Sequence, residues 1–245
     1  MTADRYSKQM ILPEFGDDGQ QKLEDASVLV VGAGGLGSTI LYNLAAAGVG
    51  TIGIADPDIV TANNLNRQFI HFEEDIGSLK VNSACRKLRE FNSLINIIPH
   101  ATALNKDNAY EIIAQYDVVA MAVNNNQAKM IINEACVELD IPFSDGNANG
   151  FVGTASFCVP HKDPCLACLY GTTQPADEAF GTVGSVVSTI AGMETTNIIQ
   201  YLLGLPVPLE GKLLCYDASA ASIETVTVEF QDNCPVCGAK AEPEE

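Results

Sequence analysis

Glycine residues gather where an apolar run of the sequence passes into a helical pattern. Four of them follow the run Val-Leu-Val-Val and are Gly32, Gly34, Gly35 and Gly37. Glycine permits a tight turn and lets the backbone approach a phosphate, and the helix that follows offers unpaired N–H groups and a positive dipole end. Asp56 stands 24 residues after Gly32 (56 − 32 = 24), where an acid binds ribose hydroxyls. The pattern predicts a nucleotide site; the alternative is a glycine turn needed only for helix–strand packing.

The glycine motif alone suggests NAD, but polar and basic residues near it in the sequence favour a triphosphate. These residues are Arg5, Lys8, Asn64, Asn66, Arg67, Gln68 and Lys80. The formal net charge is −18, and an acidic protein that binds a polyphosphate must place positive charge locally. We therefore expect ATP rather than NAD, although each basic residue taken singly is more often a surface charge.

Two Cys-x-x-Cys pairs point to a metal rather than to disulfides. They are Cys165 with Cys168 and Cys234 with Cys237, and they lie 69 residues apart (234 − 165 = 69). Four thiolates form a closed tetrahedral zinc site with no open position for water. We expect a structural Zn²⁺ that pins the C-terminal strand to the body, with two buried or redox pairs as the alternative. The other cysteines occur mostly in apolar runs typical of small core residues: Cys85, Cys136, Cys158 and Cys215.

Strand and helix patterns alternate through the first two-thirds of the chain, which is typical of a parallel sheet covered by helices. Strands are predicted at Ser27–Gly32, Thr51–Asp56, Ile95–Ala101, Asp117–Val123 and Ile141–Asp145. Helices are predicted at Leu36–Ala47, Ser78–Phe91, Asp107–Gln115 and Gln127–Leu139.

The last third changes character, with longer strands predicted at Gly150–Val159 and Ser222–Phe230. A turn-rich stretch, Thr172–Gly184, and a long helix, Ser185–Leu203, lie between them. We therefore expect an α/β, Rossmann-like fold, in which a mostly parallel central sheet is extended by antiparallel C-terminal strands and held by a structural zinc site of four cysteines.

Composition excludes several classes of function. The acidic excess speaks against general affinity for nucleic acid or an anionic membrane, because both reward basic patches. Met1–Gln9 is polar and lacks the apolar core of a secretory signal, and no apolar run reaches the length of a membrane span. We expect a cytoplasmic protein.

Taken together and in this order, the motifs resemble the ThiF/MoeB/HesA family, which is related to ubiquitin-activating enzymes. The resemblance covers nearly the whole chain, from Arg5 to Gly238. The motifs that carry it are Arg5-Tyr-Ser-Lys8-Gln, Gly32-Ala-Gly-Gly-Leu-Gly37, Asp56-x-Asp58, Asn64-Leu-Asn-Arg67-Gln68, Gly77-x-x-Lys80 and the paired Cys-x-x-Cys.

The resemblance implies ATP-dependent adenylation, with Mg²⁺, of the C-terminal glycine of a small ubiquitin-like sulfur-carrier protein. The expected nucleotide residues are Gly32, Gly34, Gly35, Gly37, Asp56, Asp58, Asn64, Arg67, Gln68 and Lys80. The expected catalytic residues are Lys8, Arg67, Lys80 and Asn124. Family members are typically homodimers, and the resemblance implies that Lys8 reaches into the partner's site.

We expect a single adenylation domain, 1–245. Its parts are a helical arm (about 1–26), a nucleotide-binding part (27–149), a carrier-binding and zinc part (150–238) that includes Thr172–Gly184, and a disordered tail (239–245).

Several positions depart from the family pattern. Lys8 and Lys129 stand where arginine is usual, so the compact charge of an ammonium group replaces the forked hydrogen-bond donors of a guanidinium group. Asn124 replaces the aspartate that is expected to help bind Mg²⁺. A neutral amide is a weaker ligand for this ion than a carboxylate, and Asp58 or Asp145 could supply a carboxylate instead. No cysteine occurs between Cys168 and Cys215, so we do not expect a covalent relay there.

Two other functions compete with the adenylation hypothesis. Asn124 supports the first of these, a family member that binds nucleotide or carrier but has little catalytic turnover. An NAD(P)-linked oxidoreductase is disfavoured, because His71, His100 and His161 lack a recognisable catalytic setting. A peptide or a small carboxylate also stays open as the substrate.

Overall fold

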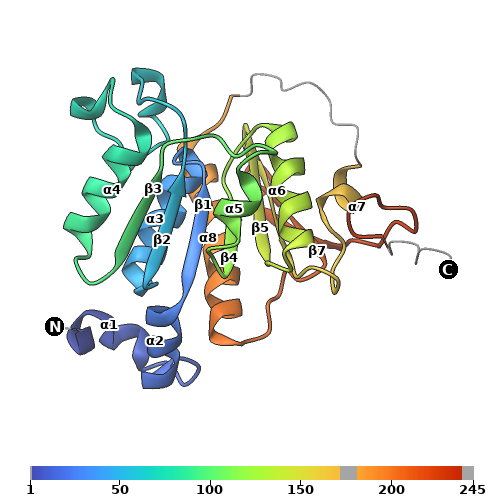
Figure 1. The fold of residues 1–245 in the computed structure, drawn as a ribbon, viewed down its shortest axis with the longest axis horizontal. Helices are drawn as coiled ribbons and strands as arrows, with labels where there is room; N and C mark the ends of the chain where they lie inside the picture. Colours follow the sequence, from blue (N-terminus) through green and yellow to red (C-terminus); the bar gives the residue numbers. More distant parts are fainter. Residues whose placement is uncertain (1, 172–180, 239–245) are drawn as a thin grey trace.

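One eight-stranded sheet forms the centre of the protein in a computed structural model that describes residues 2–171 and 181–238, with side chains from Arg5 (Figure 1). Its strand order is β3-β2-β1-β4-β5-β6-β7-β8. The strands are β1 Ser27–Val31, β2 Thr51–Ala55, β3 Asn96–His100, β4 Val118–Met121, β5 Phe143–Asn149, β6 Val152–Cys158, β7 Lys212–Asp217 and β8 Ser222–Thr227.

The first five strands pair in parallel and the last three pair antiparallel, which confirms the expected fold class. The sheet runs without a break from the predicted nucleotide-binding part into the predicted zinc part. Some details differ from the sequence prediction: β7 and α7 (Leu166–Tyr170) were not predicted, β5 continues to Asn149 instead of ending at Asp145, and β8 ends at Thr227 instead of Phe230.

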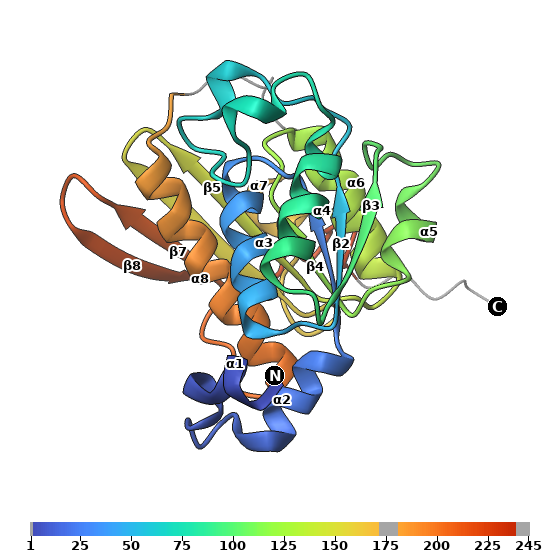
Figure 2. The same cartoon turned by 90° about the vertical axis from the view of Figure 1, so that its left-hand side faces the viewer.

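Helices cover both faces of the sheet (Figure 2). The α-helices are α1 Thr2–Met10, α2 Gly16–Asp25, α3 Gly35–Ala47, α4 Lys80–Phe91, α5 Ala109–Ile113, α6 Asn126–Glu138, α7 Leu166–Tyr170 and α8 Gly184–Leu203; 3-10 turns span Ala62–Asn64 and Glu73–Asp75. One buried cluster joins α3, α4 and α8 to the sheet, and a second joins α5, α6 and α7 to its other face. Among the described helices, none is long and apolar enough to cross a membrane.

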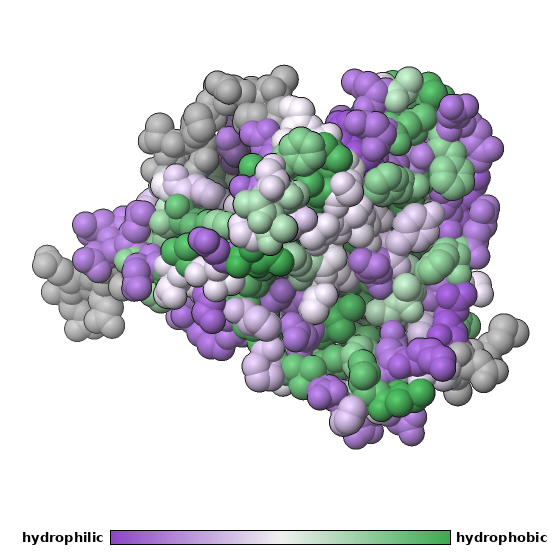
Figure 3. Space-filling view, turned by 180° about the vertical axis from the view of Figure 1, so that it is seen from behind, coloured by the Kyte–Doolittle hydropathy of each residue, from purple (hydrophilic) through white to green (hydrophobic). Residues whose placement is uncertain are grey.

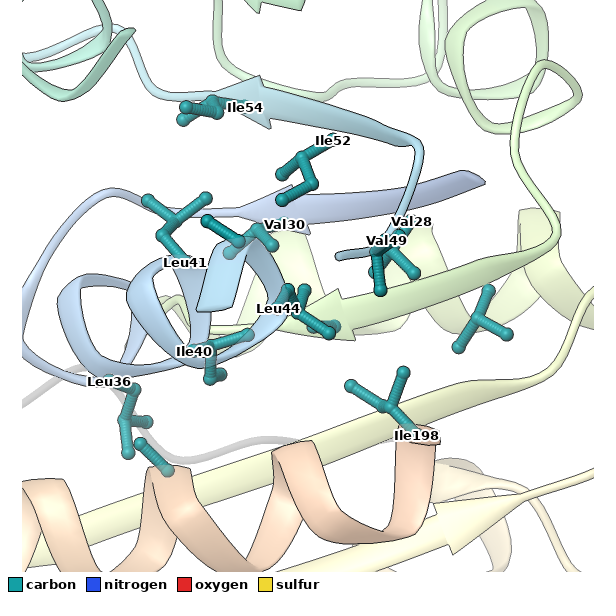
Figure 4. Close-up of a cluster of buried hydrophobic side chains, with 14 of the residues drawn as sticks. Val28, Val30, Leu36, Ile40, Leu41, Leu44, Val49, Ile52, Ile54 and Ile198 are labelled. Atoms are coloured by element: carbon teal, nitrogen blue, oxygen red, sulfur yellow. The ribbon is translucent and has the colours of Figure 1, made fainter. Parts of the chain in front are cut away.

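Helix α3 is deeply enclosed next to the predicted phosphate loop. Ile40, Leu41 and Leu44 have no exposed surface, because α3 packs against the sheet and against α8, which lies beside it (Figure 4). Full burial of such a side chain stabilises the fold by roughly 1.5–3 kcal/mol. The start of α3 is therefore held in a fixed place relative to β1.

The arm formed by α1 and α2 packs at the amino-terminal edge of the parallel strands (Figure 1). Tyr6 is buried against Gly48, directly after α3, and its hydroxyl accepts a hydrogen bond from Asn92 Nδ2 at 2.8 Å. Gln9 Nε2 donates to the Ala47 carbonyl at 2.7 Å. The arm thus contacts the end of α3 that is opposite the glycine loop.

Strand order reverses between β1 and β4. The chain runs from β1 to β2 and β3 on one side, and then crosses back to place β4 on the other side of β1. In open α/β sheets, ligands bind outside the carboxyl ends of the strands at such a switch point. The glycine loop follows β1, and Asn124 follows β4. The fold therefore brings these two segments together at the carboxyl ends of two adjacent strands.

Candidate nucleotide site and cysteine cluster

The glycine loop is a tight turn that only glycine can form at two points. Gly32 has a φ of +104°, and a Cβ there would lie 2.6 Å from the Ala122 carbonyl oxygen. A Cβ on Gly37 would lie 1.9 Å from the Gly32 carbonyl oxygen. Packing therefore explains both of these glycines. The first turn of α3 adds N–H groups that the helix does not itself use, as an anion site requires.

Asp56 ties this loop to the end of β2. Its carboxylate accepts one hydrogen bond from the Ala33 N–H at 2.7 Å and another from the Asp58 N–H at 2.8 Å. The side chain is almost fully buried. Asp56 thus fixes the backbone of the loop, and its contact with a ribose stays a prediction.

Lys80 begins α4 and lies beside the same carboxylates. Its Nζ is 2.8 Å from Asp58 Oδ2 and 4.0 Å from Asp56 Oδ2. The Lys80 side chain is buried, whereas that of Asp58 is 63% exposed. Because the Asp58 carboxylate is exposed, it can rotate toward a cation. The buried charges of Lys80 and Asp56 then still lie next to each other.

The segment after β2 folds over the start of α3. The Arg67 guanidinium donates to the Asn63 carbonyl at 3.0 Å and to Asn66 Oδ1 at 2.8 Å. A Cβ on Gly35 would lie 3.5 Å from Arg67 Cγ and 2.9 Å from Val187 Cγ1 of α8. Any larger residue at position 35 would push the arginine or α8 away.

Two polar residues of this segment hold it in shape. Asn64 Oδ1 accepts the Thr61 N–H at 3.1 Å and closes the first 3-10 turn. Gln68 is buried about 3.6 Å from the Cβ position of Gly34, and its Oε1 has no hydrogen-bond partner among the described residues.

Asn124 is exposed at the end of β4, next to the loop. Lys129, the second family arginine position, forms a buried ion pair: its Nζ lies 2.5 Å from Asp145 Oδ1, and both side chains are buried. Asp145 is therefore a poor ligand for a cation, and Asp58 is the better of the two proposed substitutes.

Sequence reasoning missed a buried polar group behind this ion pair. Glu194 of α8 is 1% exposed, and its Oε1 accepts from Ser144 Oγ at 3.1 Å. Burial, followed by the nearby Asp145 charge, raises the pKa of Glu194 to about 8. The signal in the sequence was that Glu194 is the one charged residue in α8.

Lys8 lies far from all of these residues. It is exposed on α1, next to the end of α3. Since α3 has 13 residues, its length of about 20 Å separates Lys8 from the glycine loop of the same chain.

The four predicted metal cysteines meet in one cluster, with their sulfur atoms all within 4.8 Å of one another. The Cys165 and Cys234 sulfurs are 3.7 Å apart, and those of Cys168 and Cys237 are 3.4 Å apart. Four thiolates around one ion at about 2.3 Å have sulfurs about 3.8 Å apart, so the cluster fits a tetrahedral metal.

One thiol of the cluster is already biased toward ionisation. Burial opposes the charge, but the N–H groups of Cys237 and Val236 lower the pKa of Cys234 to about 7. Outside the cluster, Cys85, Cys136 and Cys158 are buried as predicted, and Cys215 is half-buried on β7.

Comparison with known proteins agrees with this arrangement. The sequence pattern of the ThiF family matches residues 6–236. This chain belongs to the ThiF family.

Curated ThiF-family relatives align over almost the entire chain. The Sulfur carrier protein adenylyltransferase of Thermus thermophilus is 40% identical over 96% of this chain and 90% of the relative. Adenylyltransferase and sulfurtransferase MOCS3-2 of Zea mays is 40% identical, but this chain spans only 50% of it. The chain thus has about half the length of the MOCS3 relatives it matches.

Solved structures share the fold of this ThiF-family chain. Escherichia coli MccB crystallised with MccA-N7isoASN has a TM-score of 0.85 at 24% identity, over 97% of this chain and 75% of MccB. A structure of MccB with ATP has a TM-score of 0.80 at 24% identity, over 96% and 74%.

Replacing Glu194 by glutamine should remove a pH-dependent loss of stability. Glutamate in the unfolded chain ionises above about pH 4.5, while folded Glu194 stays protonated up to about pH 8. Below about pH 4.5, Glu194 is protonated in both the folded and the unfolded protein, so it does not lower the free energy of unfolding of wild type. Between the two values only the unfolded state releases its proton, which costs wild type up to about 1.4 kcal/mol per pH unit.

Urea unfolding should show Glu194→Gln within about 1 kcal/mol of wild type at pH 5 and about 2–4 kcal/mol more stable at pH 8. The exposed Glu224→Gln variant is the control and should follow wild type. A difference between Glu194→Gln and wild type that does not change with pH would contradict this assignment.

Proposed function

We propose that this protein uses ATP to adenylate the C-terminal glycine carboxylate of a small ubiquitin-like sulfur-carrier protein, with release of pyrophosphate. The main support is the full-length similarity to the Thermus thermophilus Sulfur carrier protein adenylyltransferase, combined with a glycine loop, Asp56, Arg67 and Lys80 in one crevice. The exposed Asn124 supports a second candidate, a member that binds nucleotide and carrier with little turnover.

The residues of the crevice have separate roles in this proposal. The N–H groups at the start of α3 bind phosphate oxygens, and Asp56 binds the ribose. The carrier carboxylate attacks the α-phosphorus, a P–O bond to the leaving pyrophosphate breaks, and an acyl-adenylate forms. Arg67 and Lys80 stabilise the charge that develops on the phosphates, by preorganised electrostatics.

Asp58 and Asn124 fit a Mg²⁺ ion that accompanies ATP. Both are exposed beyond the carboxyl ends of β2 and β4, the two strands that flank β1, and a carboxylate with an amide carbonyl offers the oxygen ligands that Mg²⁺ prefers. When bound, the ion would neutralise charge on the phosphates.

The antiparallel part of the sheet is the proposed place for the carrier. Exposed apolar side chains occur along it, at Phe151, Val152, Ile223 and Val226. A carrier tail ending in Gly-Gly is narrow enough to enter a crevice next to Gly35. Of the Thr172–Gly184 segment that we also expected to hold the tail, residues 172–180 lie outside the described part of the chain, as does the tail at 239–245.

ATP–pyrophosphate exchange with Mg²⁺ and carriers ending in Gly-Gly tests this function. Wild-type protein should exchange only when the right carrier is present. The double variant Arg67→Ala with Lys80→Ala should lose at least about 100-fold, because two charges that stabilise the transition state are removed. Lys106→Ala, an exposed lysine before α5, is the matched control and should keep full exchange.

An Asn124→Asp variant separates the two candidate functions in the same assay. Exchange by both wild type and variant supports the adenylation proposal. Exchange by the variant alone means that the native protein binds without turnover, and undiminished exchange by the double variant contradicts the phosphate assignment.

We propose that the cysteine cluster holds a structural Zn²⁺. The support is four sulfurs at tetrahedral spacing, three of them in buried residues, with no room among them for a substrate. Reduced thiolates of this kind suit the cytoplasm, where we propose that the protein works.

Elemental analysis of the purified protein should find about one zinc per chain. Cys234→Ser should lose the zinc and about 3–5 kcal/mol of unfolding free energy, because the C-terminal segment is released from α7. Cys215→Ser, which lies outside the cluster, should keep both. Zinc-free wild-type protein of full stability would rule the site out.

We propose that the protein works as a homodimer in which Lys8 completes the partner's nucleotide site. Lys8 cannot reach its own site past α3. A groove of about 910 Å³ lies beside it, lined by Gln9, Asn43, Met193, Leu214 and Thr225 among others. Figure 3 shows the molecule from behind, where hydrophobic and neutral residues fill the middle and hydrophilic residues border them.

Mixing two inactive variants tests whether the site is shared. In a dimer of Lys8→Ala with Arg67→Ala, one of the two sites has both residues intact. After subunit exchange the mixture should recover about a quarter of wild-type ATP–pyrophosphate exchange, since half the dimers carry one good site. No recovery, with confirmed mixed dimers, would place Lys8 outside the partner's site.

A further inference from the structure

His71 lies buried under the glycine loop, and no role in the reaction has been given to it above. Its Nε2 is 2.9 Å from the Ala33 carbonyl oxygen, and its Nδ1 is 2.9 Å from Ser83 Oγ. The imidazole is 3% exposed. Ala33 is the residue between the first two glycines of the loop.

The two contacts determine the tautomer of His71. A carbonyl oxygen only accepts hydrogen bonds, so Nε2 carries the hydrogen and donates it to Ala33. In the neutral ring, Nδ1 then accepts from the Ser83 hydroxyl. Burial lowers the pKa of His71, and the ammonium groups of Lys87 and Lys80 lower it further, which favours this neutral form.

A second buried layer holds Ser83 and therefore His71. Lys87 Nζ donates to Ser83 Oγ at 3.2 Å and forms an ion pair with Asp75. Asp75 also accepts the Phe72 N–H at 2.7 Å, and although burial opposes its charge, Lys87 lowers the pKa of Asp75 to about 2. The chain of contacts is thus fully ionised at its far end and rigid.

Two consecutive peptide groups at Ala33 are consequently held. The Ala33 N–H, in the peptide that links Gly32 to Ala33, donates to Asp56, and the Ala33 carbonyl, in the peptide that links Ala33 to Gly34, accepts from His71. A trans peptide unit is planar, so its C=O and the following N–H point in opposite directions. With the Ala33 carbonyl turned toward the buried His71, the Gly34 N–H points away from His71.

We infer that His71 is a positioning residue that aims the Gly34 N–H at a phosphate of the bound nucleotide. Ser83 and the Asp75–Lys87 pair keep the imidazole in the orientation that this requires. The inference rests on the proposed ATP-dependent function, and it gives a role to a residue that touches neither the substrate nor the reacting atoms.

Two similar substitutions separate this role from packing. Glutamine places its side-chain NH₂ near the position of Nε2, so His71→Gln keeps a donor for Ala33. Asparagine reaches only to the position of Nδ1, so His71→Asn loses it. Binding of MgATP and of adenosine is measured by calorimetry for both variants and wild type, together with the thermal midpoint.

His71→Asn should bind MgATP about 10- to 100-fold more weakly, the effect of one hydrogen bond to a charged group, and adenosine as tightly as wild type. His71→Gln should stay within about threefold of wild type for both ligands. A merely structural role would lower both affinities in proportion, or would follow the thermal midpoint rather than the phosphate.

Equal MgATP affinity of His71→Asn and wild type overturns the inference and leaves the proposed function standing. Equal loss of MgATP and adenosine binding in His71→Asn also overturns it. Wild-type protein that binds no MgATP overturns the proposed function and the phosphate-aiming role with it, so the two failures are distinguishable.

Discussion

The structure depends on the close approach of α3 to the end of β1. Gly37 lies directly on the Gly32 carbonyl, at a distance that leaves no space for a Cβ. This contact brings the first turn of an apolar helix against the sheet at its switch point. Because Ile40, Leu41 and Leu44 then pack against both the sheet and α8, the position of the glycine loop is fixed by the core itself.

Electrostatics add a second constraint, because the chain has few basic residues and many acidic ones. Several lysines are used within the fold: Lys80 pairs with Asp58, Lys87 with Asp75, and Lys129 with Asp145. Arg67 instead donates to a carbonyl and an amide, so these contacts do not cancel its charge. This retained charge is what the proposed binding of a polyphosphate requires.

The sequence was sufficient for the parallel half of the fold and the cysteine cluster, since apolar periodicity and short-range glycine or cysteine spacing are local signals. Strand β7 was missed because its burial is only partial and no alternation marks it. Lys129 was recognised only as standing at a family arginine position, and its ion-pair partner Asp145 lies 16 residues along the chain (145 − 129 = 16). Glu194 and His71 acquire meaning only from tertiary partners, which no local pattern encodes.

The short helix α7 has a consequence for the order in which a nascent chain matures. It carries Cys168, whose cluster mates Cys234 and Cys237 leave the ribosome about 70 residues later, after α8, β7 and β8. Capture of the proposed metal ion can then be completed only after α8, β7 and β8 have been synthesised. A chain that stops before Cys234 would lack two of the four proposed ligands and could not hold the ion.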